Sequence, residues 1–117
     1  MQTSRVLVVE DEFLLAREMA IALEAGGFEI AGVAPSTGAA LRLARSERVD
    51  IAILDLDIRG TALREVLALL AAQGVRLVYI TSDSRSDLPG LAPPSLQFEK
   101  PVPASFIVAA LRHDLDG

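Results

Sequence analysis

Residues 50–60 read DIAILDLDIRG. Residues 51–54 of this stretch are a short, continuous apolar run, and the acidic residue Asp55 follows directly. Apolar side chains at successive positions are typical of a strand that is buried on both faces, as in a parallel sheet covered by helices. The stretch therefore predicts a buried strand that ends at a carboxylate.

Similar short runs recur on both sides of this stretch. They lie at residues 6–9, 28–33 and 77–80, with a weaker run at 96–98. Helical patterns fill the intervals, and this alternation predicts an α/β fold, a doubly wound five-stranded parallel sheet with right-handed crossovers. The strand order 2-1-3-4-5 is one common solution for such sheets. Periodicity alone leaves the order open.

The helical patterns are recognised by apolar residues at helical spacing and by stop signals. They comprise Leu15, Met19, Ala22 and Leu23 before Gly26-Gly27; Ala40, Leu41 and Ala44 after Ser36 or Thr37; Leu63, Val66, Leu67 and Leu70 before Gly74; and Ile107, Ala110 and Leu111 after Pro103. Between the fourth and fifth strands, residues 82–95 contain Pro89, Gly90, Pro93 and Pro94. These residues break any longer helix, so this helix is expected to be short or missing.

The composition narrows the class of protein. The chain has 117 residues, which suits a single domain spanning 1–117. A net charge of -5 argues against nucleic-acid binding through this domain, and the absence of cysteine excludes disulfides and thiolate metal sites. No apolar run approaches the roughly 18 residues that span a bilayer, and the first residues lack a signal-peptide pattern. We expect a cytoplasmic protein without membrane contact.

Polar residues stand where the predicted strands end. Glu10, Asp11 and Glu12 follow the first strand, Asp55 the third, Thr81 the fourth and Lys100 the fifth. The carboxyl ends of parallel strands share one edge, so these side chains should converge. Clustered carboxylates suit a hard cation such as Mg²⁺, while a hydroxyl and an ammonium group opposite it suit a transferred phosphoryl group. Asp55 is then the candidate acceptor.

Each of these residues also has an ordinary structural explanation. Asp11 and Glu12 could cap the first helix, Asp55 and Thr81 could simply end strands, and Lys100 could be a solvated charge. It is their coincidence at four strand ends that favours a common site. Lys100 is also the only lysine in the chain, beside ten arginines.

Four segments together resemble the signature segments of response-regulator receiver domains. They are VLVVEDE (6–12), DIAILDLDIRG (50–60), VYITS (78–82) and FEKP (98–101), in the family's order. The resemblance implies the flavodoxin-like strand order 2-1-3-4-5 and a cis peptide bond between Lys100 and Pro101. It also implies the roles of individual residues: Asp55 as phosphoacceptor; Glu10, Asp11, Asp55 and the Asp57 carbonyl as Mg²⁺ ligands; Thr81 and Lys100 as phosphoryl-binding residues; and Asp57 and Asp83 as modulators of phosphoryl lifetime.

The resemblance further implies a phosphorylation-dependent switch of a bacterial two-component system. A histidine kinase or phosphotransfer protein donates the phosphoryl group, and a downstream protein partner reads the change; homodimerisation stays open. The domain is no enzyme beyond its own phosphorylation and dephosphorylation. The chain is either a stand-alone receiver or part of a longer regulator. Residues 79–83 only loosely resemble the Phe-Ala-Thr-Gly-Tyr segment of one stand-alone subgroup.

One position departs from the family pattern. Receivers usually carry an aromatic residue three positions before the lysine, where this chain has Gln97. Together with the proline-rich segment 82–95, this predicts an atypical output face, and our hypothesis is that signalling there orders a loop.

Two other functions fit part of the pattern, an aspartyl-nucleophile phosphatase and a phosphorylation-independent interaction module. Haloacid-dehalogenase-type phosphatases also use an aspartyl nucleophile, in an Asp-x-Asp motif like Asp55 to Asp57, but they require Thr or Val where this chain has Arg59. Their nucleophile also follows the first strand, not the third. A phosphorylation-independent interaction module would need none of the polar residues at the strand ends.

Overall fold

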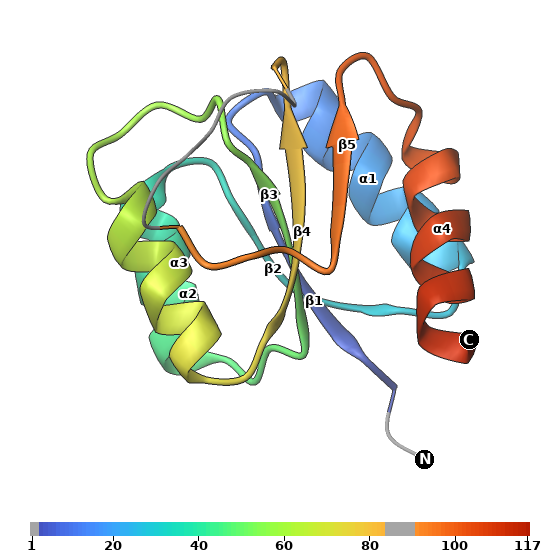
Figure 1. Cartoon of the computed structure of the whole chain (residues 1–117), viewed down its shortest axis with the longest axis horizontal. Helices are drawn as coiled ribbons and strands as arrows, with labels where there is room; N and C mark the ends of the chain where they lie inside the picture. Colours follow the sequence, from blue (N-terminus) through green and yellow to red (C-terminus); the bar gives the residue numbers. More distant parts are fainter. Residues whose placement is uncertain (1–2, 84–90) are drawn as a thin grey trace.

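The fold is built around one parallel sheet. The computed structural model describes residues 3–83 and 91–117. Its five strands are β1 (Arg5–Val9), β2 (Glu29–Ala34), β3 (Ile51–Asp55), β4 (Arg76–Thr81) and β5 (Leu96–Glu99). They pair in parallel in the order β2-β1-β3-β4-β5 (Figure 1). The predicted doubly wound sheet is confirmed, including the order that periodicity left open.

Helices cover both faces of this sheet. The four helices are α1 (Phe13–Ala25), α2 (Thr37–Ser46), α3 (Leu63–Ala72) and α4 (Ala104–Asp116). Helices α1 and α4 lie against one face, and α2 and α3 against the other (Figure 1). Among the described residues, no helix combines the length and the apolar character that crossing a membrane requires.

The central strand β3 separates two hydrophobic cores. Side chains alternate between the faces of a strand, so Ile51 and Ile53 pack into the core beneath α1 and α4, while Ala52 and Leu54 pack into the core beneath α2 and α3. All residues of β3 are buried. This explains why the strand reads as a continuous apolar run.

The connection from β4 to β5 was expected to hold a short helix or none. Its described residues, 82–83 and 91–95, contain no helix, while residues 84–90 lie outside the described residues. The described residues before β5 contact Tyr79 of β4. The hydroxyl of Tyr79 donates a hydrogen bond to the Ala92 carbonyl. The backbone N–H of Ser95 then donates to the Leu77 carbonyl at 2.8 Å. These bonds lead the chain into β5.

The turn after β3 touches the start of α2. Of the two candidate caps, Ser36 caps α2, and its side chain accepts a hydrogen bond from the Ala39 N–H at 3.1 Å. Next to it lies the buried Thr37, and Gly60 lies against this threonine with a φ of +127°. A Cβ at Gly60 would stand 2.3 Å from Thr37 Oγ1. Only glycine fits this contact and this backbone conformation.

We expect Gly60→Ala to lower the free energy of unfolding by about 2 kcal/mol or more, because it adds a clash to an unfavourable φ. Gly74→Ala is the matched control, since Gly74 also has a positive φ of +76° but nothing within 4 Å of its Cβ position. It should cost about 1 kcal/mol. Urea denaturation measures both values. Equal losses in the two variants would contradict the importance of the Thr37 contact.

Candidate functional site

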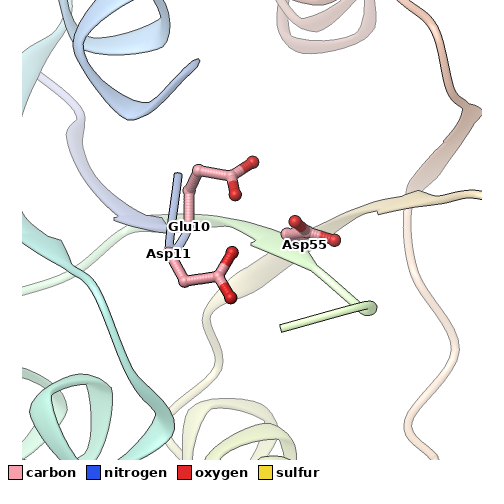
Figure 2. Close-up of side chains that lie close together, drawn as sticks. All are labelled: Glu10, Asp11 and Asp55. Carbon is pink, nitrogen blue, oxygen red and sulfur yellow. The ribbon is translucent and has the colours of Figure 1, made fainter. Parts of the chain in front are cut away.

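Three carboxylates gather at the carboxyl edge of the sheet. Glu10 and Asp11 follow β1, and Asp55 is the last residue of β3. One carboxylate oxygen from each lies within 4.8 Å of the others (Figure 2). Glu10 is 9% exposed and Asp55 is 3% exposed, whereas Asp11 is open to solvent. The predicted convergence of the strand ends β1 and β3 is therefore present.

Neither acid caps α1 with a side-chain hydrogen bond, which was the alternative explanation for Asp11 and Glu12. Glu12 is the N-cap residue of α1, and its side chain makes no capping hydrogen bond. Instead its backbone N–H donates to Glu10 Oε2 at 3.1 Å. The acidic stretch after β1 thus serves to position Glu10 toward the sheet edge.

The electrostatics of this cluster fit a divalent cation. The pKa of Glu10 is raised from 4.5 to about 7, mainly by burial and also by the neighbouring Asp55, against the lowering effects of the Glu12 N–H and of Lys100. Burial and a neighbouring carboxylate both disfavour the ionised form of Glu10, and a bound cation would offset both effects. Oxygen ligands from Glu10, Asp11 and Asp55 are the donor set that Mg²⁺ prefers.

Lys100 approaches the cluster from β5. Its Nζ lies 3.0 Å from Asp55 Oδ2 and 3.3 Å from Asp57 Oδ2. Burial alone would lower the pKa of Lys100, but the hydrogen bonds and charges of Asp55 and Asp57 outweigh it and raise the pKa above its usual value. The Lys100–Pro101 bond is cis, as the family resemblance predicted. The ammonium group is thus held, charged, against the candidate acceptor.

Thr81 ends β4 at the same edge and is buried. Its Oγ1 accepts a hydrogen bond from the Asp83 N–H at 3.2 Å. The backbone N–H of Lys100 donates to the Thr81 carbonyl at 2.9 Å, so the ends of β4 and β5 are tied together. The hydroxyl is therefore engaged by the following turn, and Asp83 contacts it through the backbone.

Asp57 has contacts that the sequence reasoning missed. It was singled out for its backbone carbonyl and for phosphoryl lifetime, yet its side chain accepts hydrogen bonds from the Ser82 N–H at 2.8 Å and from Ser82 Oγ at 3.2 Å. Its own N–H donates to Asp55 Oδ1 at 2.8 Å. Burial acts to raise the pKa of Asp57, but the bonds from Ser82 and Lys100 outweigh it and lower the pKa. The contact could have been expected only from the pairing of β3 with β4, because Asp57 and Ser82 follow the ends of these two neighbouring strands.

Gln97 occupies an exposed position of β5 beside Tyr79 of β4. The inward-facing aromatic residue of β5 is its neighbour Phe98, which packs edge-to-face on Phe106 of α4 with ring centroids 6.0 Å apart. On the face that Gln97 shares, the aromatic residue is Tyr79, which is buried. The chain therefore carries aromatic side chains around position 97 but not at it.

Known proteins match this chain in fold and in sequence pattern. A family model described as the response regulator receiver domain matches residues 6–90. No curated protein sequence matches significantly. Among solved structures, the receiver domain of the response regulator PhyR from Erythrobacter litoralis has a TM-score of 0.83 and 22% identity, covering 99% of this chain and 92% of that one.

Two further solved structures are similar. The signal receiver domain of a modulated diguanylate cyclase from Desulfovibrio desulfuricans G20 has a TM-score of 0.79 and 31% identity, covering 98% of this chain and 95% of that one. The response regulator TrrA from Thermotoga maritima, solved in complex with Mg²⁺-BeF, has a TM-score of 0.79 and 25% identity, covering 96% and 99%. Since the family model spans most of the chain and the fold agrees with it, this chain belongs to the response regulator receiver domains.

Proposed function

We propose that this protein is a signalling switch in which Asp55 accepts a phosphoryl group in the presence of Mg²⁺. The observation that carries the proposal is the position of Asp55 between two opposite sets of groups. One carboxylate oxygen from each of Glu10, Asp11 and Asp55 lies within 4.8 Å of the others, and Lys100 Nζ lies 3.0 Å from Asp55 Oδ2. A nucleophilic carboxylate, a cation site and a fixed positive charge are the parts that phosphoryl transfer requires.

Each residue of the site has a separate role in this phosphoryl transfer. An Asp55 oxygen attacks phosphorus of a phosphohistidine, so that an O–P bond forms while the N–P bond breaks and the imidazole leaves. Lys100 neutralises the oxygens that the phosphoryl group brings, and the Thr81 hydroxyl gives up its turn contact to bind one of them. Glu10, Asp11, Asp55 and the Asp57 carbonyl would hold Mg²⁺, which supplies further positive charge to these oxygens.

The partners follow from this chemistry. The donor is a histidine kinase or a phosphotransfer protein, and the product is read by a downstream protein partner. The net charge of -5 supports protein partners over nucleic acid. The complex of TrrA with Mg²⁺-BeF supports Mg²⁺ as the cofactor. The protein is then no enzyme in the multiple-turnover sense, and it acts in the cytoplasm beside its kinase.

Incubation with acetyl phosphate and Mg²⁺ should add one phosphoryl group, seen by intact mass spectrometry. Asp55→Asn should abolish the addition, because an amide oxygen is a poor nucleophile, and EDTA should suppress it in the wild type. A modification that persists in Asp55→Asn would remove Asp55 from the acceptor role. Continuous release of phosphate from a small phosphomonoester would favour a phosphatase, and no addition from acetyl phosphate or a cognate kinase would favour a phosphorylation-independent module.

Without metal, the protein should lose stability as the pH rises from 5 to 8. Glu10 has a pKa of about 7 in the folded protein and 4.5 in the unfolded chain, so over this range the unfolded chain binds fewer protons. The expected loss in the free energy of unfolding is on the order of 2 kcal/mol. The pKa of Asp57 is lowered and stays below this pH range, and the pKa of Lys100 is raised and stays above it. Neither group therefore changes the pH dependence of stability between pH 5 and 8.

Urea denaturation in EDTA at several pH values measures this loss, and Glu10→Gln is the control because it cannot ionise. The variant should show a flatter pH profile. Adding Mg²⁺ at pH 8 should stabilise the wild type more than Glu10→Gln, because the metal binds the ionised carboxylate. The same slope in both proteins would rule out Glu10 as its source.

A further inference from the structure

The Asp57 carboxylate occupies hydrogen-bond donors of Ser82 and Lys100 that a phosphoryl group on Asp55 would also bind. Its Oδ2 accepts from the Ser82 N–H at 2.8 Å and lies 3.3 Å from Lys100 Nζ, while its Oδ1 accepts from Ser82 Oγ at 3.2 Å. Asp57 thus joins the turn after β3 to the residue after β4 and to the end of β5. These three segments surround the candidate acceptor.

A phosphoryl group on Asp55 would bring three oxygens and a charge of about -2 to the same place. Lys100 already contacts Asp55 at 3.0 Å, and Ser82 directly follows Thr81. The new oxygens therefore compete with the Asp57 side chain for the Lys100 ammonium group and for the Ser82 N–H. Two anions beside each other also repel, which disfavours keeping the Asp57 carboxylate in place.

We infer that the Asp57 carboxylate is a built-in competitor of the phosphoryl group, which holds Ser82 and Lys100 in the unphosphorylated protein and must release them on phosphorylation. The inference rests on the proposed function. It concerns what the Asp57 side chain holds before phosphorylation, which is distinct from the effect on phosphoryl lifetime that the family resemblance implies and from the metal-binding role of the Asp57 carbonyl.

The position of Asp57 suits this role. Its side chain is 37% exposed, so it can turn toward solvent without leaving a buried charge unpaired. Release would cost the contacts of the carboxylate with the Ser82 N–H, the Ser82 hydroxyl and the Lys100 ammonium group, and would free the backbone at Ser82. Because Ser82 begins the connection from β4 to β5, the event at Asp55 reaches this connection without an aromatic side chain at position 97.

The test is a titration with beryllium fluoride, a phosphoryl mimic that binds a carboxylate, at saturating Mg²⁺. Removing the competitor should tighten binding, by about fivefold in Asp57→Ala and by less in Asp57→Asn, whose amide oxygen still accepts from the Ser82 N–H. Asp116→Asn, which removes the same charge at the exposed end of α4, should bind like the wild type.

Hydrogen exchange at the Ser82 amide gives a second measurement that needs no phosphoryl mimic. Without ligand, exchange should be faster in Asp57→Ala than in the wild type, and thermal melting confirms that the variant is folded. If both Asp57 variants bind beryllium fluoride no more tightly than the wild type, the inference is wrong while the proposed function stands. If the wild type itself fails to bind, the proposed function fails and the inference with it.

Discussion

Asp55 is a carboxylate almost without contact with water, at the end of a strand that is buried on both faces. Removing such a charge from water costs several kcal/mol unless partners compensate for it. The compensation comes from Lys100 at 3.0 Å and from the Asp57 N–H at 2.8 Å, so segments 45 and two residues away in the sequence must meet here. The parallel sheet makes this meeting possible because it delivers every strand end to one edge.

Among residues 3–83 and 91–117, four carboxyl groups gather at this edge, and Lys100 forms ion pairs with two of them. Glu10, Asp11, Asp55 and Asp57 lie around the single ammonium group of Lys100, and the raised pKa of Glu10 is a consequence of burial in this setting. A cluster of carboxyl groups with this composition favours a cation. If Asp55 accepts a phosphoryl group as proposed, binding of a metal and binding of that group are coupled through Asp55, since both use its oxygens.

The sequence predicted the strands, the helices and the residues at the strand ends, because these follow from periodicity and from the geometry of parallel sheets. Strand order needed the family resemblance, since apolar runs do not say which strands are neighbours. The contact of Asp57 with Ser82 was missed because it depends on side-chain rotamers in two turns. For the same reason Arg5, which forms ion pairs with Glu29 and Glu47 at the opposite end of β1, could not be predicted. The absence of an aromatic residue at Gln97 was visible in the sequence, and the run 77–80 was expected to be buried, but the pairing of Tyr79 with Gln97 could not be predicted.

The alternation of Ile51 and Ile53 with Ala52 and Leu54 has a consequence for how such a chain can change over time. The sheet separates two hydrophobic cores. Residues in different cores share few neighbours, so their contributions to the free energy of unfolding are almost additive. Substitutions beneath α1 and α4 can therefore accumulate without repacking the core beneath α2 and α3. One face of the sheet can therefore diverge in sequence while the other face and the shared carboxyl edge keep their structure.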